Sequence, residues 1–431
     1  MTVKVGIKEG EEINVFFHGK YSSDDHRGVV EGSLQFHPSD FNGDIVFTPL
    51  EYHNSYFDLT DVTIGISFHW ERRETQSFQG SLLLRSDGTT ITAINILPVE
   101  DYLQSVVSSE MKATAPLEFL KAHAIISRSW LIAQIEGIAD SGGKDMTDNE
   151  EERIRWYDHH QHIGFDVCAD DHCQRYQGIS RIVNERAKEA VESTAGLILT
   201  YDEEICDTRF SKCCGGAFEE FSSCWGSRNY PYLKAGRDST EDAVIKDLTE
   251  EGNARKWIEG GPEAFCNTKD IALLQESLNG YDQETDDFYR WKVEYSNPEL
   301  SSILRERTGI DFGHIKDIIL MERGVSGRLI KIRVCGSKRS LVIGKELEIR
   351  KCLSRSHLYS SAFIVDKAVS KGYGTEGKLY PDRFIIRGSG WGHGVGLCQI
   401  GAAVMASKGF DHREILSHYY PGATLQSITR K

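Results

Sequence analysis

The sequence has no run of apolar residues approaching the roughly 20 that a membrane-spanning helix needs, so we expect no transmembrane segment. It also has no basic excess, because 65 Asp and Glu residues outnumber 50 Lys and Arg residues and give a net charge of -15. Since binding to a phosphate backbone needs a basic surface, nucleic acid is excluded as the expected partner. The start, MTVKVGIKEGEEI, lacks the charged-then-apolar pattern of a secretory signal. Either an export signal has been removed or the protein works inside the cell.

The ten cysteines have no regular spacing. A chain of 431 residues has room for two or three domains and buries a large core without disulfide staples. We therefore expect most of the cysteines to be free and buried. Apolar residues at 39% and charged residues at 27% are typical of an ordinary globular protein and exclude a disordered chain.

Residues 3–97 are rich in predicted strands. Apolar residues alternate with others at Val62, Ile64, Ile66, Phe68 and Trp70, which is the period of a half-buried strand. The dipeptide DG at 87–88, between SLLLRS and TTITAINI, predicts a hairpin turn. This region is expected to form an antiparallel sheet or small barrel and carries no functional signal.

The stretch PVEDYLQSVVSSEMKATAPLEFLKAHAIISRSWLIAQ, residues 98–134, predicts two helices that begin at Pro98 and Pro116. Glu110 lies at or just past the last turn of the first helix. The negative end of the helix dipole and any burial both disfavour its charge, so its pKa is expected to be raised, as a general acid requires. Arg128, the only arginine of the second helix, is expected to pair with an anionic or sugar substrate or with Glu110.

The segment WYDHHQHIGFDVCADDHCQRYQGI places three histidines before two cysteines, with His172 between the cysteines. Several nitrogen and sulfur ligands within reach of one loop favour zinc. The spacing C-x4-C is longer than the usual C-x2-C knuckle, so the pattern also suits a buried cysteine pair or a disulfide. The preceding Gly- and acid-rich residues, GIADSGGKDMTDNEEERIRW, are expected to lie at the surface.

The central part of the chain predicts a helix at 182–193 and a strand at 197–201, followed by Gly215 and Gly216, which allow a close approach to a ligand. Residues 239–290 are acidic, with a helix expected near 268–277, and their charges are expected to be solvated. The residues after 290 predict a β-rich lobe with a hairpin turn at 324–327.

The segment RGSGWGHGVGLCQIGA carries glycines at 388, 390, 392, 394 and 396. Such a segment cannot form a helix and predicts a loop that approaches a ligand closely. His393 lies between two glycines, which leaves its ring open to a cleft or lets it hold the loop through a backbone hydrogen bond. Helices are expected at 399–407 and 412–420.

EDYLQSVVSSEM, PLEFLKAHAIISRSW and GWGHGVGLCQIGA resemble motifs of the SpoIID/LytB family of peptidoglycan-acting proteins, and the resemblance extends from about Gly80 onward. It implies that KELEIRKCLS and SSAFIVDKAV belong to a closing sheet. It also implies a set of substrate-binding residues: Arg128, Cys214, Gly215, Gly216, Tyr232, Lys234, His393 and Gln399. Tyr232 and Lys234 would line a glycan cleft whose floor is formed by 214–216. The implied zinc ligands are His162, Cys168 and Cys173, with water, His160 or His172 as the fourth.

The expected fold is α+β and two-lobed, with a helical catalytic segment packed against antiparallel sheets or small barrels and a surface insertion. We expect an N-terminal β-rich region at 1–97 and a catalytic core with the Cys/His loop at 98–238. An acidic insertion follows at 239–290, and a second β-rich lobe ends the chain at 291–431.

The resemblance implies a lytic transglycosylase that acts on peptidoglycan strands, favouring those stripped of stem peptides, and leaves 1,6-anhydro-N-acetylmuramic ends. Glu110 would act first as acid and then as base, and zinc would be structural. The resemblance also implies a site of action outside the cytoplasm and an amidase that strips the stem peptides as a partner. The family has Pro where Lys112 stands, and a cation there opposes a raised Glu110 pKa unless it points to solvent.

Two other functions fit the same residues. The first is a zinc-dependent amidase that cleaves the peptide from muramic acid with metal-bound water, although metallohydrolases favour His and carboxylate ligands over cysteine. The second is a non-catalytic glycan-binding module that activates a separate amidase.

Overall fold

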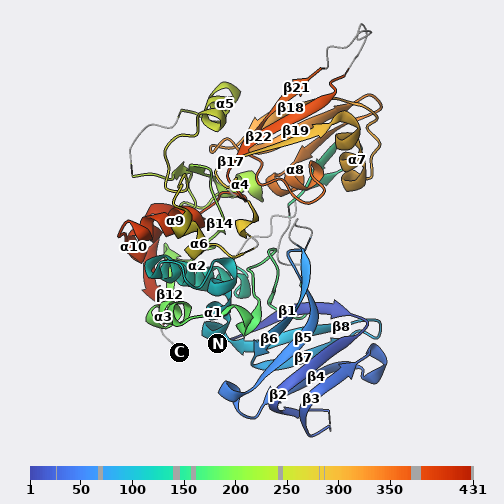
Figure 1. Ribbon diagram of the computed structural model, residues 1–431, viewed down its shortest axis with the longest axis vertical. Coiled ribbons are helices and arrows are strands. Elements are labelled where there is room, and N and C mark those ends of the chain that lie inside the picture. Colours follow the sequence, from blue (N-terminus) through green and yellow to red (C-terminus); the bar gives the residue numbers. More distant parts are fainter. Residues whose placement is uncertain are drawn as a thin grey trace.

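The computed structural model describes residues 1–25, 27–66, 71–138, 146–156, 162–240, 246–280, 282–285, 287–369 and 380–428. The fold is α+β, as predicted, with a β-rich lobe at each end and a layer of helices between them (Figure 1). Over the described residues, no helix combines the length and apolar character needed to cross a membrane. The ten cysteines are all free and seven of them are buried, which confirms that prediction.

The N-terminal lobe is a nine-stranded sheet with the order β11-β1-β8-β7-β4-β2-β5-β6, and β3 pairs with β2. Its pairings are antiparallel except that of β1 with β11, which is parallel. The DG turn predicted from the sequence joins β7 to β8. The strands are β1 (Thr2–Gly10), β2 (Ile13–Ser23), β3 (Val29–Phe36), β4 (Gly43–Pro49), β5 (Tyr56–Ile64), β6 (Arg72–Gln79), β7 (Ser81–Ser86), β8 (Ile91–Pro98) and β11 (Val167–Cys168).

The alternating segment that predicted a strand is only partly one. Val62 and Ile64 are buried at the end of β5, as expected, whereas Ile66 lies beyond the strand and is half exposed. Phe68 and Trp70 lie outside the described residues.

The helical layer is built around α2, which packs against α1, α3, α9 and α10. Pro98 and Pro116 precede α1 and α2, as predicted. The face of α1 that carries Leu103, Val106 and Val107 is fully buried. The helices are α1 (Val99–Glu110), α2 (Leu117–Ile135), α3 (Glu185–Ser193), α6 (Ile271–Ser277), α9 (Gln399–Ser407) and α10 (His412–Tyr419). Beside them, β12 (Leu197–Tyr201) pairs with β13 (Glu204–Ile205) and β24 (Thr424–Ser427).

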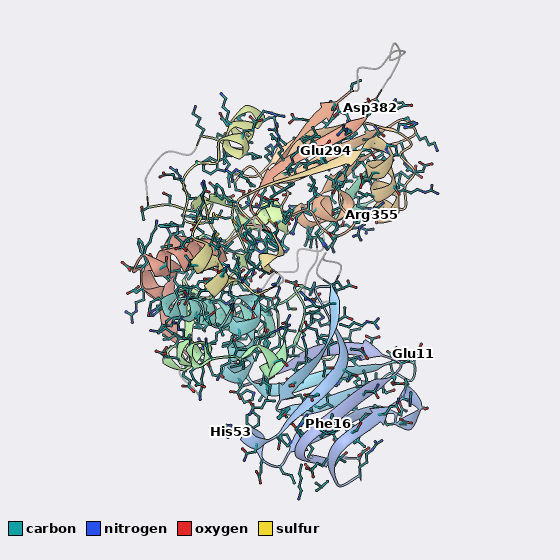
Figure 2. All side chains as sticks on the ribbon, in the orientation of Figure 1. Glu11, Phe16, His53, Glu294, Arg355 and Asp382 are labelled. Atoms are coloured by element: carbon teal, nitrogen blue, oxygen red, sulfur yellow. The ribbon has the colours of Figure 1, made fainter. Side chains whose placement is uncertain are left out.

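The second lobe has its own apolar core and two sheets, with orders β18-β19-β20-β10-β9 and β17-β22-β21. Figure 2 shows Glu294 and Arg355 on this lobe and Phe16 on the N-terminal sheet. The strands are β9 (Thr147–Asp148), β10 (Glu152–Ile154), β17 (Arg290–Ser296), β18 (Ile315–Arg323), β19 (Leu329–Gly336), β20 (Ser340–Gly344), β21 (Phe363–Ala368) and β22 (Arg383–Ser389). The helices are α5 (Glu251–Gly260), α7 (Asn297–Thr308) and α8 (Glu346–Cys352).

One prediction for this lobe is wrong. The segment KELEIRKC forms α8 rather than a strand, because Glu346 and Arg350 lie one helical turn apart and form a buried ion pair at 3.4 Å. Residues 148–151 are exposed, as expected for a surface segment, and they join β9 to β10, which extends the sheet in parallel with β20.

The glycine-rich loop is tied to the segment that follows β14 (Phe210–Ser211). β14 pairs in parallel with β23 (Leu397–Cys398), and Cys213 and Trp391 exchange two backbone hydrogen bonds of 3.0 and 2.7 Å. An added Cβ on Gly215 would lie 2.8 Å from the backbone nitrogen of Gly390. Nearby, α4 (Phe221–Cys224) follows β15 (Ala217–Phe218), which pairs with β16 (Gly236–Arg237). The two predicted glycine segments therefore pack on each other.

Candidate functional site

A cavity of about 410 Å³ lies where the helical layer, the cysteine loop and the second lobe meet. Glu110 and Trp130 line it from α1 and α2, and α8 contributes residues from the opposite lobe. The remaining wall comes from the segments 170–175, 208–212 and 391–393. Its aromatic lining, which suits the apolar faces of sugar rings, consists of Trp130, Trp156, Phe210, Trp225 and Trp391.

Glu110 is the last residue of α1, and only 7% of it is exposed. The backbone N–H of Arg175 donates to Oε1 at 2.9 Å, and Nε2 of Gln399 donates to Oε2 at 3.4 Å. Burial raises the pKa of Glu110, against the opposing effect of Arg175 and Lys212. Among the described residues, no Lys or Arg side chain forms an ion pair with its carboxyl group. The position and the raised pKa agree with the sequence-based expectation.

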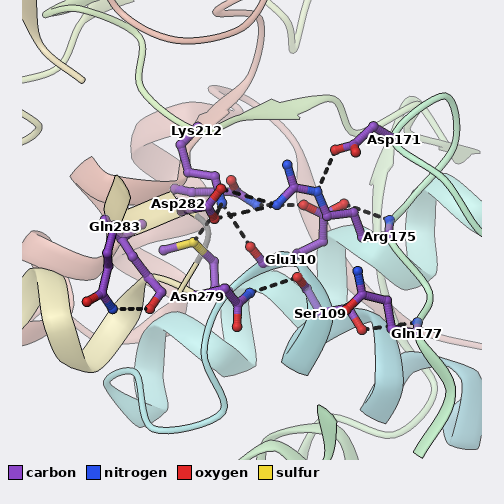
Figure 3. Close-up of polar contacts among 12 residues, drawn as sticks. Ser109, Glu110, Asp171, Arg175, Gln177, Lys212, Asn279, Asp282 and Gln283 are labelled. Atoms are coloured by element: carbon purple, nitrogen blue, oxygen red, sulfur yellow. Dashed lines mark hydrogen bonds and ion pairs between the residues drawn. The ribbon is translucent and has the colours of Figure 1, made fainter. Parts of the chain in front are cut away.

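A buried ion network surrounds the end of α1 (Figure 3). Nζ of Lys212 donates to the backbone carbonyl of Glu110 at 2.9 Å and to Asp282 at 2.8 Å. Nη1 of Arg175 lies 3.4 Å from Asp282, and its Nε donates to Asp171 at 2.5 Å. Burial alone would raise the pKa of Asp282, but Lys212 and Arg175 outweigh it and hold that pKa below its ordinary value. Lys212 thus satisfies a carbonyl at the helix end, and the carboxylate of Asp282 balances its positive charge.

The acidic insertion contributes to this site through Asp282, which departs from the expectation that the insertion's charges are solvated. Asp282 is fully buried. Nδ2 of Asn279 donates to the carbonyl of Ser109 at 2.8 Å, which satisfies a second carbonyl at the end of α1. The helix predicted in the insertion is confirmed as α6.

Gln399 is held beside Glu110 by His123, which no sequence motif marked as part of the site. Nε2 of Gln399 lies 3.0 Å from Nε2 of His123, and Nδ1 of His123 lies 3.2 Å from the hydroxyl of Ser127. Burial lowers the pKa of His123 to about 3, so the ring is neutral. A neutral ring accepts the Gln399 amide hydrogen on Nε2 and donates from Nδ1 to Ser127, which fixes the amide nitrogen toward Glu110.

Lys112 does not contact the Glu110 carboxyl group and so does not oppose its raised pKa directly. Its Nζ donates to the carbonyl of Gln275 at 3.0 Å, and its backbone N–H donates to Ser277 at 2.8 Å. The side chain therefore points toward the insertion. The cations that act on Glu110 are Lys212 and Arg175 instead.

His393 lines the cavity on the glycine-rich loop, where Gly392 and Gly394 have φ angles of 95° and 76°. Its Nδ1 accepts the backbone N–H of Val395 at 3.1 Å, and its ring packs edge-on against Trp225 at 4.9 Å. Burial, reinforced by nearby arginines, lowers the pKa of His393 well below its ordinary value, so the ring is neutral. Both sequence-based roles, holding the loop and facing the cavity, are compatible with this position.

The cysteine loop gathers four metal-ligand atoms within 4.8 Å of one another, those of His162, Cys168, His172 and Cys173. Sγ of Cys173 lies 3.2 Å from Nε2 of His162 and 3.6 Å from Nδ1 of His172. A sulfur and a nitrogen bound to one tetrahedral zinc are about 3.5 Å apart, so the set fits this ion. Of the candidates for the fourth ligand, His172 belongs to the group, and His160 lies outside the described residues.

The N-terminal sheet positions this loop. Cys168 belongs to β11, which adds to the edge of the sheet beside β1. The ring of Phe165 fills the space over Gly6, where an added Cβ would lie 2.7 Å from it. His172 and Cys173 reach the cavity wall. A closed set of four protein ligands leaves no open position for substrate, which is the arrangement of a structural zinc site.

Arg128 is not a partner of Glu110. Its guanidinium is 1% exposed and binds both carboxylate oxygens of Glu100, at 3.0 and 2.6 Å, and the carbonyl of Leu197 at 2.9 Å. This face of α2 packs on the start of α1 and on β12, away from the cavity. Arg128 therefore joins three elements of the fold.

The remaining residues of the implied glycan cleft do not line the cavity. Tyr232 is buried, and its hydroxyl accepts the N–H of Asp207 at 2.9 Å. It borders a different pocket from the one that Glu110 lines. Lys234 is exposed. Cys214, Gly215 and Gly216 lie beneath the glycine-rich loop rather than at the cavity surface.

Residues 87–201 match the family model described as Stage II sporulation protein, and residues 219–396 match a domain of unknown function (DUF8618). An uncharacterized protein of Brachyspira hyodysenteriae is 26% identical over 82% of this chain and 73% of its own length. The Amidase enhancer of Bacillus subtilis is 26% identical over 75% of this chain and 40% of its own length. Stage II sporulation protein D of Bacillus subtilis is 23% identical, covering 78% of this chain and 77% of its own length.

Proposed function

We propose, because the chain belongs to the SpoIID family, that it is a lytic transglycosylase acting on peptidoglycan strands, favouring those without stem peptides. The observation that carries the proposal is the position of Glu110. Its carboxyl group borders an aromatic-lined cavity, has a raised pKa and is held by two neutral N–H donors. A carboxyl group whose pKa is raised by burial can donate a proton to a glycosidic oxygen.

A single carboxyl group is sufficient for this reaction, in contrast to the pair that ordinary glycosidases use. Protonated Glu110 gives its proton to the leaving oxygen as the bond to C1 of the muramic sugar breaks. The resulting Glu110 carboxylate then removes the proton from the C6 hydroxyl of the same sugar, and that oxygen bonds to C1. The products are a 1,6-anhydro sugar and a free 4-hydroxyl on the departing strand, and no water is consumed.

The surrounding residues position Glu110. Lys212 and Asn279 hold the carbonyls at the end of α1, and the Gln399–His123 pair holds Oε2. The other two carboxylates of the network are paired, Asp282 with Lys212 and Arg175, and Asp171 with Arg175. Lys212 and Arg175 hold the pKa of Asp282 below its ordinary value, whereas burial raises the pKa of Glu110, which marks Glu110 as the acid of the group.

Zinc has a supporting role in this proposal. His162, Cys168, His172 and Cys173 would hold the ion and fix the loop. The backbone N–H of Arg175, two residues after Cys173, donates to Glu110. Thiolate is the metal-binding form of cysteine, and contact with Cys173 holds the pKa of Cys168 well below its ordinary value.

The proposal is tested with peptide-free and peptide-bearing glycan strands, incubated with wild type, Glu110→Gln and Glu192→Gln. Glu192 is an exposed glutamate on α3 and serves as the matched control. Mass spectrometry is expected to detect 1,6-anhydro ends with wild type and the control, mostly from peptide-free strands, and none with Glu110→Gln. Equal product from all three proteins would refute the assignment.

A second candidate is a non-catalytic module that binds glycan and activates an amidase outside the cytoplasm. The name of one relative, Amidase enhancer, favours it. In this case the purified protein binds peptide-free strands and stimulates an added peptidoglycan amidase, and Glu110→Gln changes neither property. A zinc-dependent amidase is supported less well, because the four protein ligands leave no position for a metal-bound water.

A further inference from the structure

A second group of metal-ligand atoms lies beneath the glycine-rich loop, apart from the cysteine loop and from the cavity lining. The thiols of Cys214, Cys266 and Cys398 and the carboxyl group of Asp238 lie within 4.8 Å of one another. The exposed fraction of each residue is 2% or less. The four residues come from four separate segments, and neither the cavity chemistry nor the zinc loop uses them.

The sulfur geometry fits a shared ion better than a covalent bond. Sγ of Cys214 and Sγ of Cys266 are 3.6 Å apart. Two thiolates bound to one tetrahedral zinc at about 2.3 Å each are about 3.8 Å apart, whereas the sulfurs of a disulfide are about 2.05 Å apart. The mutual distances of all four ligand atoms suit one ion rather than a multinuclear cluster.

The surrounding backbone holds each ligand in place. Sγ of Cys398 accepts the N–H groups of Cys214 at 3.2 Å and of Gly401, in the first turn of α9, at 3.4 Å. Donors of this kind favour the thiolate that a metal requires. Asp238 accepts the N–H of Cys266 at 2.8 Å and the hydroxyl of Tyr419 at 2.6 Å, which orients its carboxylate.

All four side chains of this group become negative when they lose a proton, and no Lys or Arg among the described residues forms an ion pair with Asp238. Over the described residues, Asp238 forms no ion pair, although it is fully buried. A buried carboxylate among thiols is costly unless it is protonated or bound to a metal. Three soft sulfur ligands with one oxygen ligand favour zinc among the common divalent ions.

We propose that Cys214, Asp238, Cys266 and Cys398 bind a second metal ion of the zinc class. The ion joins the double-glycine turn, the start of the acidic insertion and the first residue before α9. Its structural effect is to fix Gln399, which directly follows Cys398, and the loop that carries His393. The proposal stands whether or not Glu110 is catalytic.

The test is a metal count on the purified full chain by elemental mass spectrometry. Wild type is expected to hold about two zinc equivalents per chain, one for each four-ligand set. Cys266→Ser is expected to lose one equivalent and Cys168→Ser/Cys173→Ser the other. Cys206→Ser alters a buried cysteine outside both groups and is expected to keep both equivalents.

The Cys168→Ser/Cys173→Ser variant decides the question even if Cys266→Ser does not fold. Loaded with cobalt(II), it is expected to show a thiolate-to-cobalt charge-transfer band from the buried group. Absence of both zinc and this band, with wild type holding one equivalent, overturns the proposal. So does an intact mass two hydrogens lower with a Cys214–Cys266 disulfide in the peptide map.

Discussion

Two buried glutamates in different regions of the molecule have similar electrostatics and different access. Glu110 ends α1 beside the cavity, and Glu219 lies beneath the glycine-rich loop. Burial raises the pKa of both carboxyl groups. Oε2 of Glu219 accepts the N–H and the hydroxyl of Ser326, at 3.1 and 2.6 Å, and Oε1 accepts the N–H of Glu220 at 2.9 Å.

The difference lies in what each carboxyl group can reach. Glu219 is fully buried, and an added Cβ on Gly324 would lie 2.4 Å from its Oε2, so the backbone closes over it. Glu110 lines the cavity, and its carboxyl group accepts hydrogen bonds from two N–H groups. A raised pKa therefore does not identify a proton donor without access to substrate.

The largest expected effect separates these two glutamates. Glu110→Gln is expected to lower the rate of anhydro-product formation by on the order of 10³-fold with an unchanged melting temperature, because it removes a general acid and base. Glu219→Gln is expected to keep the rate per folded molecule and to lower the free energy of unfolding by about 1–3 kcal/mol, because a fully buried acceptor is altered. Rate assays and urea unfolding measure the two quantities. A rate loss in Glu219→Gln as large as that in Glu110→Gln would remove the distinction.

The next effect concerns the buried ion network at the end of α1, beside Glu110. Asp282→Asn leaves Lys212 and Arg175 buried without their shared carboxylate, and is expected to lower the free energy of unfolding by about 3 kcal/mol. The unopposed cations would also lower the Glu110 pKa. Glu263→Gln changes an exposed glutamate of the same insertion and is the control. Similar unfolding curves for the two variants would show that the network contributes little.

The pH dependence follows from the raised pKa of Glu110. The first step needs the protonated carboxyl group, so kcat/KM is expected to fall as pH rises through the Glu110 pKa, which lies above 4.5. The same shift adds stability that is present at low pH and is lost as pH rises through the folded-state pKa. Because Lys212 lowers the Glu110 pKa, Lys212→Met is expected to move the falling limb upward by about one unit. A downward movement would contradict the assignment of Glu110 as the acid.

Removal of zinc from the cysteine loop is expected to lower the stability of the fold and to leave the rate per folded molecule nearly unchanged. Chelation should lower the melting temperature, because the ligands come together only in the folded chain, and should reduce activity in parallel with the folded fraction. Calorimetry and product assays on the same samples measure both. Loss of activity at an unchanged melting temperature would favour the amidase hypothesis instead.

Lys112→Met is expected to have the smallest effect. The side chain contacts the carbonyl of Gln275 and does not act on the Glu110 carboxyl group, so the falling limb of kcat/KM should move by less than about 0.3 units. The Lys212→Met profile recorded alongside it provides the comparison. A shift as large as that of Lys212→Met would mean that Lys112 turns toward Glu110 when substrate is bound.

Local sequence patterns were sufficient for several parts of the site. Pro98 and the apolar spacing after it place Glu110 at a helix end, and closely spaced glycines produce the loop that carries His393. The zinc ligands lie within 12 residues of one another, so their spacing limits how far apart they fold. The resemblance to the SpoIID family selected Gln399, which does lie beside Glu110.

The same patterns misplaced residues whose partners are distant in sequence. Arg128, the only arginine of its helix, was expected to pair with a substrate or with Glu110, but its partner is Glu100, 28 positions away. Lys212 and Asp282, separated by 70 positions, carry no motif that marks them as partners. The sequence of an acidic segment predicts solvated charges when the cationic side chains that pair with them lie far away along the chain.

The sequence by itself determined many of the helices and strands, the glycine-rich loop and the set of thiols and imidazoles in the cysteine loop, because these depend on residues that are neighbours along the chain. Only the tertiary structure decided which charges are buried together, which glutamate borders the cavity and which cysteines form groups. Burial and electrostatic pairing depend on distances between segments, and those distances exist only after the sheets and helices have packed.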